Sequence, residues 1–140
     1  LEFNVRFGDP ETQVLMSVLD GDLGDTLDGA ARGRLDTSSL IVSPRHALSV
    51  VIAAAGYPGM PKEGDVIAGL DEAAAVEGVE IYHAGTRRRG ADVVTAGGRV
   101  LGVTAQGTTL AEASGRAYRA VDRIRFPGMQ CRRDIGARAR

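Results

Sequence analysis

The chain has 140 residues, 44% of them hydrophobic and 25% charged, which is typical of one globular domain or of a small domain with part of another. Its net charge of −1 and its 4% of aromatic residues exclude a strong field for DNA and a stacking platform for bases. A single cysteine, Cys131, excludes an internal disulfide, and no apolar run is long enough for a membrane span. We therefore expect a cytoplasmic protein with neither nucleic acid nor membrane as a partner.

Apolar and polar side chains alternate over residues 1–7, which predicts a strand with one buried face that ends at Gly8. Asp9 and Pro10 then predict a helix start, with Asp9 as the N-cap and Pro10 at the first helical position. This helix ends at Asp20-Gly21. Its apolar stripe consists of Val14, Leu15, Val18 and Leu19.

A second helix is predicted from about residue 22 to residue 32. Gly24 and Gly29 each cost it roughly 1 kcal/mol relative to alanine, so it depends on tertiary packing. Its apolar face consists of Leu23, Leu27 and Ala31. A polar break follows at 36–39, and we divide the chain there into residues 1–42 and residues 43–140.

Strands dominate the prediction beyond this boundary. The apolar run 46–55 indicates a buried strand, and a turn-rich loop follows it. Shorter strands are expected within 65–70 and 79–85. Residues 92–95 and 99–105 flank Ala96-Gly97-Gly98 and are expected to pair as a β-hairpin.

A well-marked helix closes the pattern. Thr109 and Glu112 have the spacing of a capping box at its start. Its inward stripe consists of Leu110, Ala113, Ala117, Val121 and Ile124. Helices come first, strands next and a helix last, an order that favours an α+β fold over a doubly wound parallel sheet.

Three polar residues of the first predicted strand could carry chemistry. Glu2 and Asn4 project to one face and offer hard oxygen ligands of the kind that suits Mg²⁺ or Mn²⁺. Arg6 lies one step further along that face, where a guanidinium could stabilise phosphoryl charge. By spacing alone, the alternative of an ordinary solvated strand face stays open.

A second candidate group is Arg132-Arg133-Asp134. Two neighbouring guanidinium groups offer forked donors that match a phosphate. In an extended segment the two arginines point to opposite sides, so one of them would make the direct contact, and Asp134 would orient an arginine. From the residues alone, the alternative of a solvated charge cluster stays open.

Several ordered motifs then point to one family. The run EFNVRFGDPETQ resembles the last metal-binding strand and the following loop of an ATP-grasp ligase. Further along come AAAGYPG, KEGDVIAGL, IYHAGT, GGRVLGVTAQG, AYRAV and CRRDIGARA. Together they span nearly the whole chain and resemble the C-terminal third of the phosphoribosylamine–glycine ligase family, also called glycinamide ribonucleotide synthetase.

The resemblance implies an ATP-dependent ligase that activates glycine as glycyl phosphate and joins it to 5-phosphoribosylamine in de novo purine biosynthesis. It implies the end of an ATP-grasp domain over 1–42, followed by a small antiparallel-sheet domain with a rudiment single hybrid motif over 43–140. The implied metal ligands are Glu2 and Asn4, which would hold Mg²⁺ or Mn²⁺ against ATP as the co-substrate. The implied catalytic residue is Arg6, and the implied substrate-binding residues are Asp9, Arg132 and Arg133.

In that family the ATP-binding lobe lies upstream of the matched region, so we expect the chain to begin inside an active site and to need that lobe as its partner. The alternative expectation is a stand-alone binding or interaction module derived from the ligase. Under either alternative, the 140 residues alone are not expected to turn over ATP.

Overall fold

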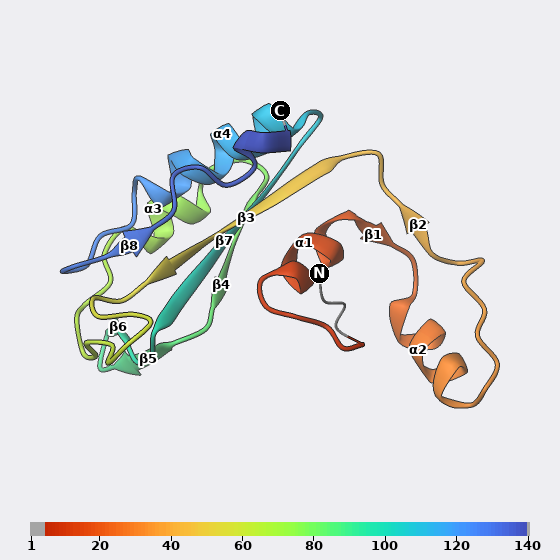
Figure 1. Cartoon of the computed structure of the whole chain (residues 1–140), viewed down its shortest axis with the longest axis horizontal. Helices are drawn as coiled ribbons and strands as arrows, with labels where there is room; N and C mark the ends of the chain where they lie inside the picture. Colours follow the sequence, from red (N-terminus) through yellow and green to blue (C-terminus); the bar gives the residue numbers. More distant parts are fainter. Residues whose placement is uncertain (1–4, 140) are drawn as a thin grey trace.

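The structure is a computed structural model, and it describes residues 5–139 (Figure 1). A four-stranded antiparallel sheet with helices against it forms the larger part, and most of the residues before β3 (His46–Ala53) extend from it as an arm that contains α2 (Leu23–Ala31) (Figure 1). This arrangement confirms the expected α+β class. Within residues 5–139, no helix has the length and apolarity needed to cross a bilayer.

The sheet has the strand order β4-β7-β3-β8. Its long central pair consists of β3 (His46–Ala53) and β7 (Arg99–Gly107), with Val50 opposite Val103. On the outer side of β7 lies β4 (Val79–His83), and the short β8 (Gln130–Cys131) pairs only with Ile52 and Ala53. The strands expected within 46–55 and 79–85 are thus confirmed.

The helix α4 (Leu110–Val121) covers one face of this sheet. Thr109 caps it, because the Glu112 backbone N–H donates to Thr109 Oγ1 at 3.1 Å. The Glu112 carboxylate accepts in turn from the backbone N–H of Thr108 at 2.7 Å, which lowers the pKa of Glu112. The fully buried residues of the predicted stripe are Ala113, Ala117, Val121 and Ile124, which pack against the apolar face of β3 and β7.

Two expectations for residues 65–105 were wrong. β6 (Asp92–Thr95) pairs with β5 (Thr86–Arg89) and not with β7, because β3 and β4 already occupy both edges of β7. The stretch 65–70 forms only isolated bridges at Val66 and Ala68, and α3 (Leu70–Ala74) begins at its end.

α1 (Glu11–Val18) lies on the sheet face opposite α4. Gln13 of α1 lines a small cavity with Val51, whose side chain alternates with those of Val50 and Ile52 in the α4 core. The predicted helix is therefore present, but it begins at Glu11 with Pro10 as the N-cap and without a side-chain cap. The Asp9 carboxylate is not available for capping, because it binds Gln13 and Arg99 instead.

The expected first strand is not formed over residues 5–7, and its first four residues lie outside the described part of the chain. A strand needs the backbone groups of a neighbour, and no strand pairs with these residues within 5–139. Val5 is fully exposed and Phe7 is 51% exposed, as expected for the apolar face of a strand without a sheet.

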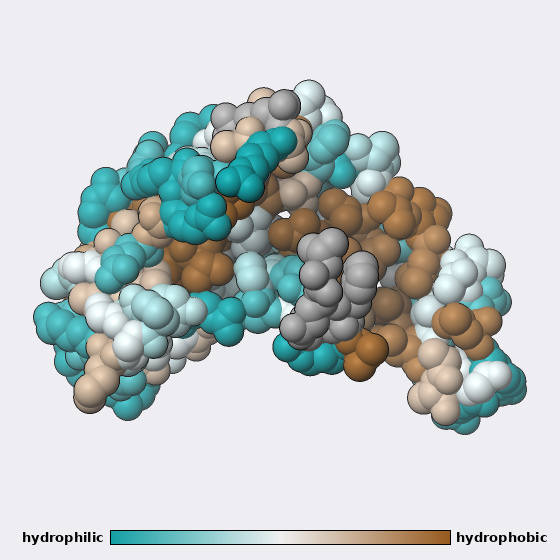
Figure 2. All heavy atoms as spheres, in the orientation of Figure 1, coloured by the Kyte–Doolittle hydropathy of each residue, from teal (hydrophilic) through white to brown (hydrophobic). Residues whose placement is uncertain are grey.

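The rest of the arm contains β1 (Leu19–Asp20), α2 (Leu23–Ala31) and β2 (Ile41–Val42), and β1 pairs with β2. Asp22 caps α2, whose bounds agree with the predicted helix, but the predicted apolar face is not buried: Leu27 is 48% exposed, and Thr26 is the buried residue of this helix. The arm is too thin to enclose a core. Hydrophobic side chains therefore lie on its surface, as the brown spheres on the right of Figure 2 show. Its strongly exposed apolar residues include Leu35, Ile41 and Val42.

Candidate functional site

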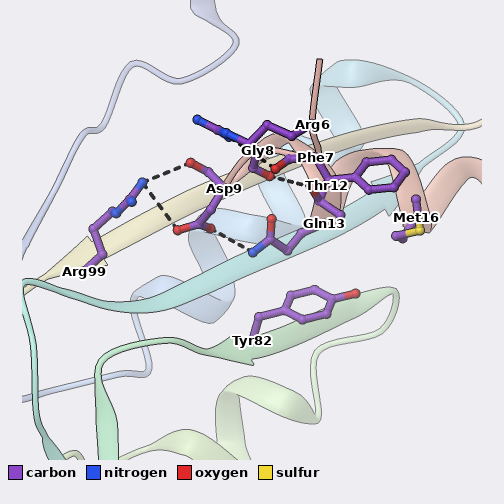
Figure 3. Close-up of a pocket in the computed structure, with 9 residues that line it drawn as sticks. All are labelled: Arg6, Phe7, Gly8, Asp9, Thr12, Gln13, Met16, Tyr82 and Arg99. Atoms are coloured by element: carbon purple, nitrogen blue, oxygen red, sulfur yellow. Dashed lines mark hydrogen bonds and ion pairs between the residues drawn. The ribbon is translucent and has the colours of Figure 1, made fainter. Parts of the chain in front are cut away.

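An open cavity of about 790 Å³ lies where the N-terminal loop meets the sheet (Figure 3). The loop contributes residues 6–9, and α1 contributes Thr12, Gln13 and Met16. Tyr82 of β4 and Arg99 of β7 complete the lining. Groups that are far apart in the sequence therefore surround one space.

Arg99 and Asp9 join the two sides of this cavity. Arg99 Nη1 donates to the Asp9 backbone carbonyl at 3.0 Å and lies 3.4 Å from Asp9 Oδ2 (Figure 3). Gln13 Nε2 donates to Asp9 Oδ1 at 2.9 Å, so the carboxylate is held from both sides. Arg99 was not identified as a site residue from the sequence, although it lies in the matched motif GGRVLGVTAQG.

Tyr82 stands below the loop on the floor of the cavity (Figure 3). Its hydroxyl donates to Glu80 Oε2 at 2.5 Å. Desolvation by burial raises the pKa of Tyr82 to about 12, and the Glu80 carboxylate contributes to the shift. Tyr82 is therefore a neutral hydrogen-bonding group at physiological pH.

A second open cavity of about 360 Å³ lies beside the first, at the end of β3. Its wall combines the apolar residues Val51 and Ala53 with Tyr57, and β8 supplies Cys131. Arg99 and Arg132 contribute the two guanidinium groups of its lining. The lining is thus mostly uncharged, and its charged side chains are these two arginines.

The two neighbouring arginines of the C-terminal segment have different surroundings. Arg132 lines the second cavity and forms a two-point contact with Asp134, at 2.9 and 2.7 Å, which lowers the pKa of Asp134. Arg133 binds Asp122 at 2.6 Å and lies over the Tyr118 ring at 5.8 Å.

The structure brings together some of the residues predicted from the sequence. Arg6 and Asp9 line the first cavity, and Arg132 lines the second. Arg6 is exposed, and its guanidinium donates to the Phe7 carbonyl at 3.2 Å. The predicted metal ligands Glu2 and Asn4 lie outside the described residues. Among residues 5–139, no three His, Cys, Asp or Glu side chains are grouped to hold a metal.

Comparison with known proteins shows the family of the chain. Residues 47–138 match the family described as phosphoribosylglycinamide synthetase, C domain. The chain belongs to this family. The match covers the whole four-stranded sheet apart from the first residue of β3, together with α4 and the Arg132 segment.

Curated relatives of the family extend the similarity to the N-terminal arm. The chain is 53% identical over 139 residues to a phosphoribosylamine–glycine ligase of Mesorhizobium japonicum, covering 99% of this chain and 32% of that protein. It is 54% identical to the enzyme of the same name from Streptomyces coelicolor, of which it covers 34%. The chain therefore spans about a third of the length of these relatives.

A solved structure agrees with this assignment. The crystal structure of phosphoribosylamine–glycine ligase from Thermotoga maritima superimposes with a TM-score of 0.79 at 34% identity. The superposition covers 96% of this chain and 32% of that one. The similarity therefore includes most of the arm as well as the sheet.

Proposed function

We propose that this chain forms the C-terminal part of an ATP-dependent C–N ligase that joins glycine to 5-phosphoribosylamine through glycyl phosphate, in the cytoplasm. The observation that carries the proposal is the similarity over 99% of the chain to ligases of that name. A structural observation supports it: the cavity lined by the N-terminal loop and the cavity lined by Arg132 share Arg99. Two small substrates held in adjoining cavities would have their reacting groups brought close together.

The chain's own side chains would bind and orient the substrates. Arg6, exposed at the rim of the first cavity, would lie against the acyl phosphate and stabilise its negative charge. Asp9, held by Arg99 and Gln13, would attract the amine side of a substrate. Arg132 would bind the 5′-phosphate through the guanidinium N–H groups that Asp134 leaves free, and Arg133, the next residue, would add its positive charge.

The same proposal includes a divalent cation and ATP. A carboxylate from Glu2 and an amide oxygen from Asn4 form a hard oxygen donor set that fits Mg²⁺ or Mn²⁺. When bound, the metal would neutralise charge on the nucleotide phosphates. The lobe that binds the rest of ATP would come from the part of the ligase that precedes the matched region in the relatives.

Kinetics of the full-length ligase test this proposal. Product formation should require ATP, glycine and 5-phosphoribosylamine together. Glu2→Ala should lower kcat at least about 100-fold, since it removes a ligand of the divalent cation that would neutralise phosphate charge. Arg132→Ala and Arg133→Ala should raise the KM for phosphoribosylamine.

Arg87→Ala is the matched control, because Arg87 is an exposed arginine on β5 and lines none of the cavities described above. Unchanged kinetics in the Glu2, Arg132 and Arg133 variants would contradict the site assignment. Product formation by the 140-residue chain alone would contradict its dependence on the ATP-binding lobe.

A further inference from the structure

β4 is an edge strand of the four-stranded sheet. One side of it pairs with β7, and no strand pairs with its other side within residues 5–139. An open groove of about 360 Å³ lies along β4, and Leu70, Asp71 and Ala74 of α3 line it together with residues of the strand. A free sheet edge presents backbone N–H and C=O groups that can pair with another strand. There is therefore space beside this edge for a strand of another chain.

The pairing with β7 determines which backbone groups of β4 face away from the sheet. The Gly78 carbonyl accepts a hydrogen bond from β7 at 2.9 Å, and the Ala84 N–H donates one to β7 at 3.1 Å. Because hydrogen-bonded pairs alternate along an antiparallel ladder, Ile81 and His83 direct both their N–H and their C=O outward. Val79 directs only its carbonyl outward to a new partner, since its N–H already bonds within the preceding turn at 3.1 Å.

The outward groups of β4 are complementary to those of a second β4. When two copies meet about a two-fold axis at Ile81, the N–H of each Ile81 faces the carbonyl of the other. The His83 N–H of each copy then faces the Val79 carbonyl of the other copy. Both outward donors of the strand thus find an acceptor. A two-fold axis uses the same surface on both copies, so the assembly closes with two chains.

The side chains of β4 fit the same arrangement. Glu80 of one copy lies opposite Tyr82 of the other in a non-hydrogen-bonded pair, where side chains are closest. The two Glu80 carboxylates are a diagonal step apart, so no like charges stand directly opposite each other. Tyr82 forms the floor of the first cavity (Figure 3), and the second copy therefore places its Glu80 beside that cavity.

On the opposite face of the strand, the two half-buried Ile81 side chains meet across the axis. His83 of each copy is directed to the groove of the other, whose lining contains the Asp71 carboxylate. The exposed His83 ring uses Nδ1 for a contact of 3.0 Å with Thr86 Oγ1. Within the described part of the chain its Nε2 has no hydrogen bond, so this nitrogen can bind the carboxylate. The charges of the strand and the groove are thus complementary between copies.

We propose that the free edge of β4 is an interface between two copies of this chain, in which the two β4 strands pair antiparallel about Ile81 and join the two sheets into one. The strand has 5 residues, so the contact is small and the dimer is reversible, with a Kd in the micromolar range. This inference goes beyond the ligase reaction and does not depend on it.

Sedimentation velocity of the full-length protein tests the interface. The wild type should change from monomer to dimer as its concentration rises from about 1 μM to about 200 μM. His83→Pro removes an outward N–H and keeps the bonds to β7, and it should raise the dimer Kd at least about tenfold, because each dimer loses two hydrogen bonds. The matched control is His83→Ala. It keeps the N–H and loses an exposed side-chain contact, so its Kd should stay within about threefold of the wild-type value.

Hydrogen exchange tests the position of the interface without a substitution. The backbone amides of Ile81 and His83 should exchange more slowly in the wild type at about 200 μM than at about 1 μM, because pairing protects them. His83→Ala should show the same protection at Ile81. This measurement decides the matter even if His83→Pro does not fold.

Three results would overturn the proposal. They are a wild type that stays monomeric over the whole concentration range, a dimer with the same Kd in His83→Pro and His83→Ala, and exchange at Ile81 that does not depend on concentration. Each of them leaves the ligase proposal standing, because the kinetics of the Glu2, Arg132 and Arg133 variants test that proposal separately.

Discussion

Arg133 Nη1 lies 2.6 Å from Asp122 Oδ1, just after the last residue of α4, while the neighbouring Arg132 faces the second cavity. The Arg133 guanidinium also covers the ring of Tyr118, whose hydroxyl donates to the Arg132 carbonyl at 3.0 Å. The two adjacent arginines thus have different roles. Arg133 attaches the C-terminal segment to the end of α4, and Arg132 lines the second cavity.

Because the contacts of Arg132 and Arg133 differ, replacing each of them by alanine should have a different effect. Arg133→Ala should lower the free energy of unfolding by no more than about 1 kcal/mol, because the pair with Asp122 is exposed. It should raise the Kd of ribose 5-phosphate less than Arg132→Ala does. Denaturant unfolding and calorimetry on both variants check this. A larger effect of Arg133→Ala than of Arg132→Ala on sugar binding would show that Arg132 is not the main phosphate ligand.

Gly69 is a position where the backbone leaves no room for a side chain. Its φ is +81°, and an added Cβ would lie 2.0 Å from the Arg123 carbonyl oxygen. Gly69→Ala should therefore cost about 2–4 kcal/mol of unfolding free energy, from left-handed strain and from displacement of the 121–125 segment. Gly90→Ala is the matched control: its φ is +63° with no atom within 4 Å of the added Cβ, so about 1 kcal/mol is expected. Equal losses in the two variants would contradict the steric argument.

The small residues of α4 let it approach the sheet closely. Ala117 is fully buried between the helix and the central strands, so Ala117→Leu should overpack the core and cost about 1–3 kcal/mol. Ala111→Leu places the same side chain on the exposed face of the same helix and should change stability by less than about 0.5 kcal/mol. Chemical denaturation of both variants measures the difference, and an Ala117→Leu protein as stable as the wild type would refute tight packing here.

Tyr82 predicts a stability change at alkaline pH. Its pKa is raised by burial to about 12, above the ordinary value of 10.0, so the folded state retains a proton that the unfolded state loses first. The contribution of Tyr82 to the unfolding free energy is therefore complete below pH 10 and is lost as the pH rises from about 10 to about 12.

Ultraviolet absorbance of tyrosinate should show a late titration in the wild type that is absent from Tyr82→Phe. Glu80→Gln removes the neighbouring negative charge and should shift that titration to lower pH. A titration unaffected by Glu80→Gln would mean that burial alone holds the proton on Tyr82.

Local patterns in the sequence were sufficient for those elements that depend on nearby residues. The capping box at Thr109 and Glu112, the stripe of α4 and the apolar run of β3 all appear as predicted, since neighbouring residues determine a cap and a buried run. The ordered motifs also led to the family, which the match over residues 47–138 confirms.

Pairing and contacts between distant segments were decided only by the tertiary structure. Residues 92–95 had the pattern of a hairpin with 99–105, yet β6 pairs with β5 because the edges of β7 were already filled by strands from elsewhere in the chain. Asp9 had the local environment of an N-cap, yet its carboxylate turns to Arg99, which no spacing rule links to it across 90 residues. A local sequence pattern shows which side-chain and backbone groups a segment has. Which distant residues contact those groups is determined only when the chain is folded.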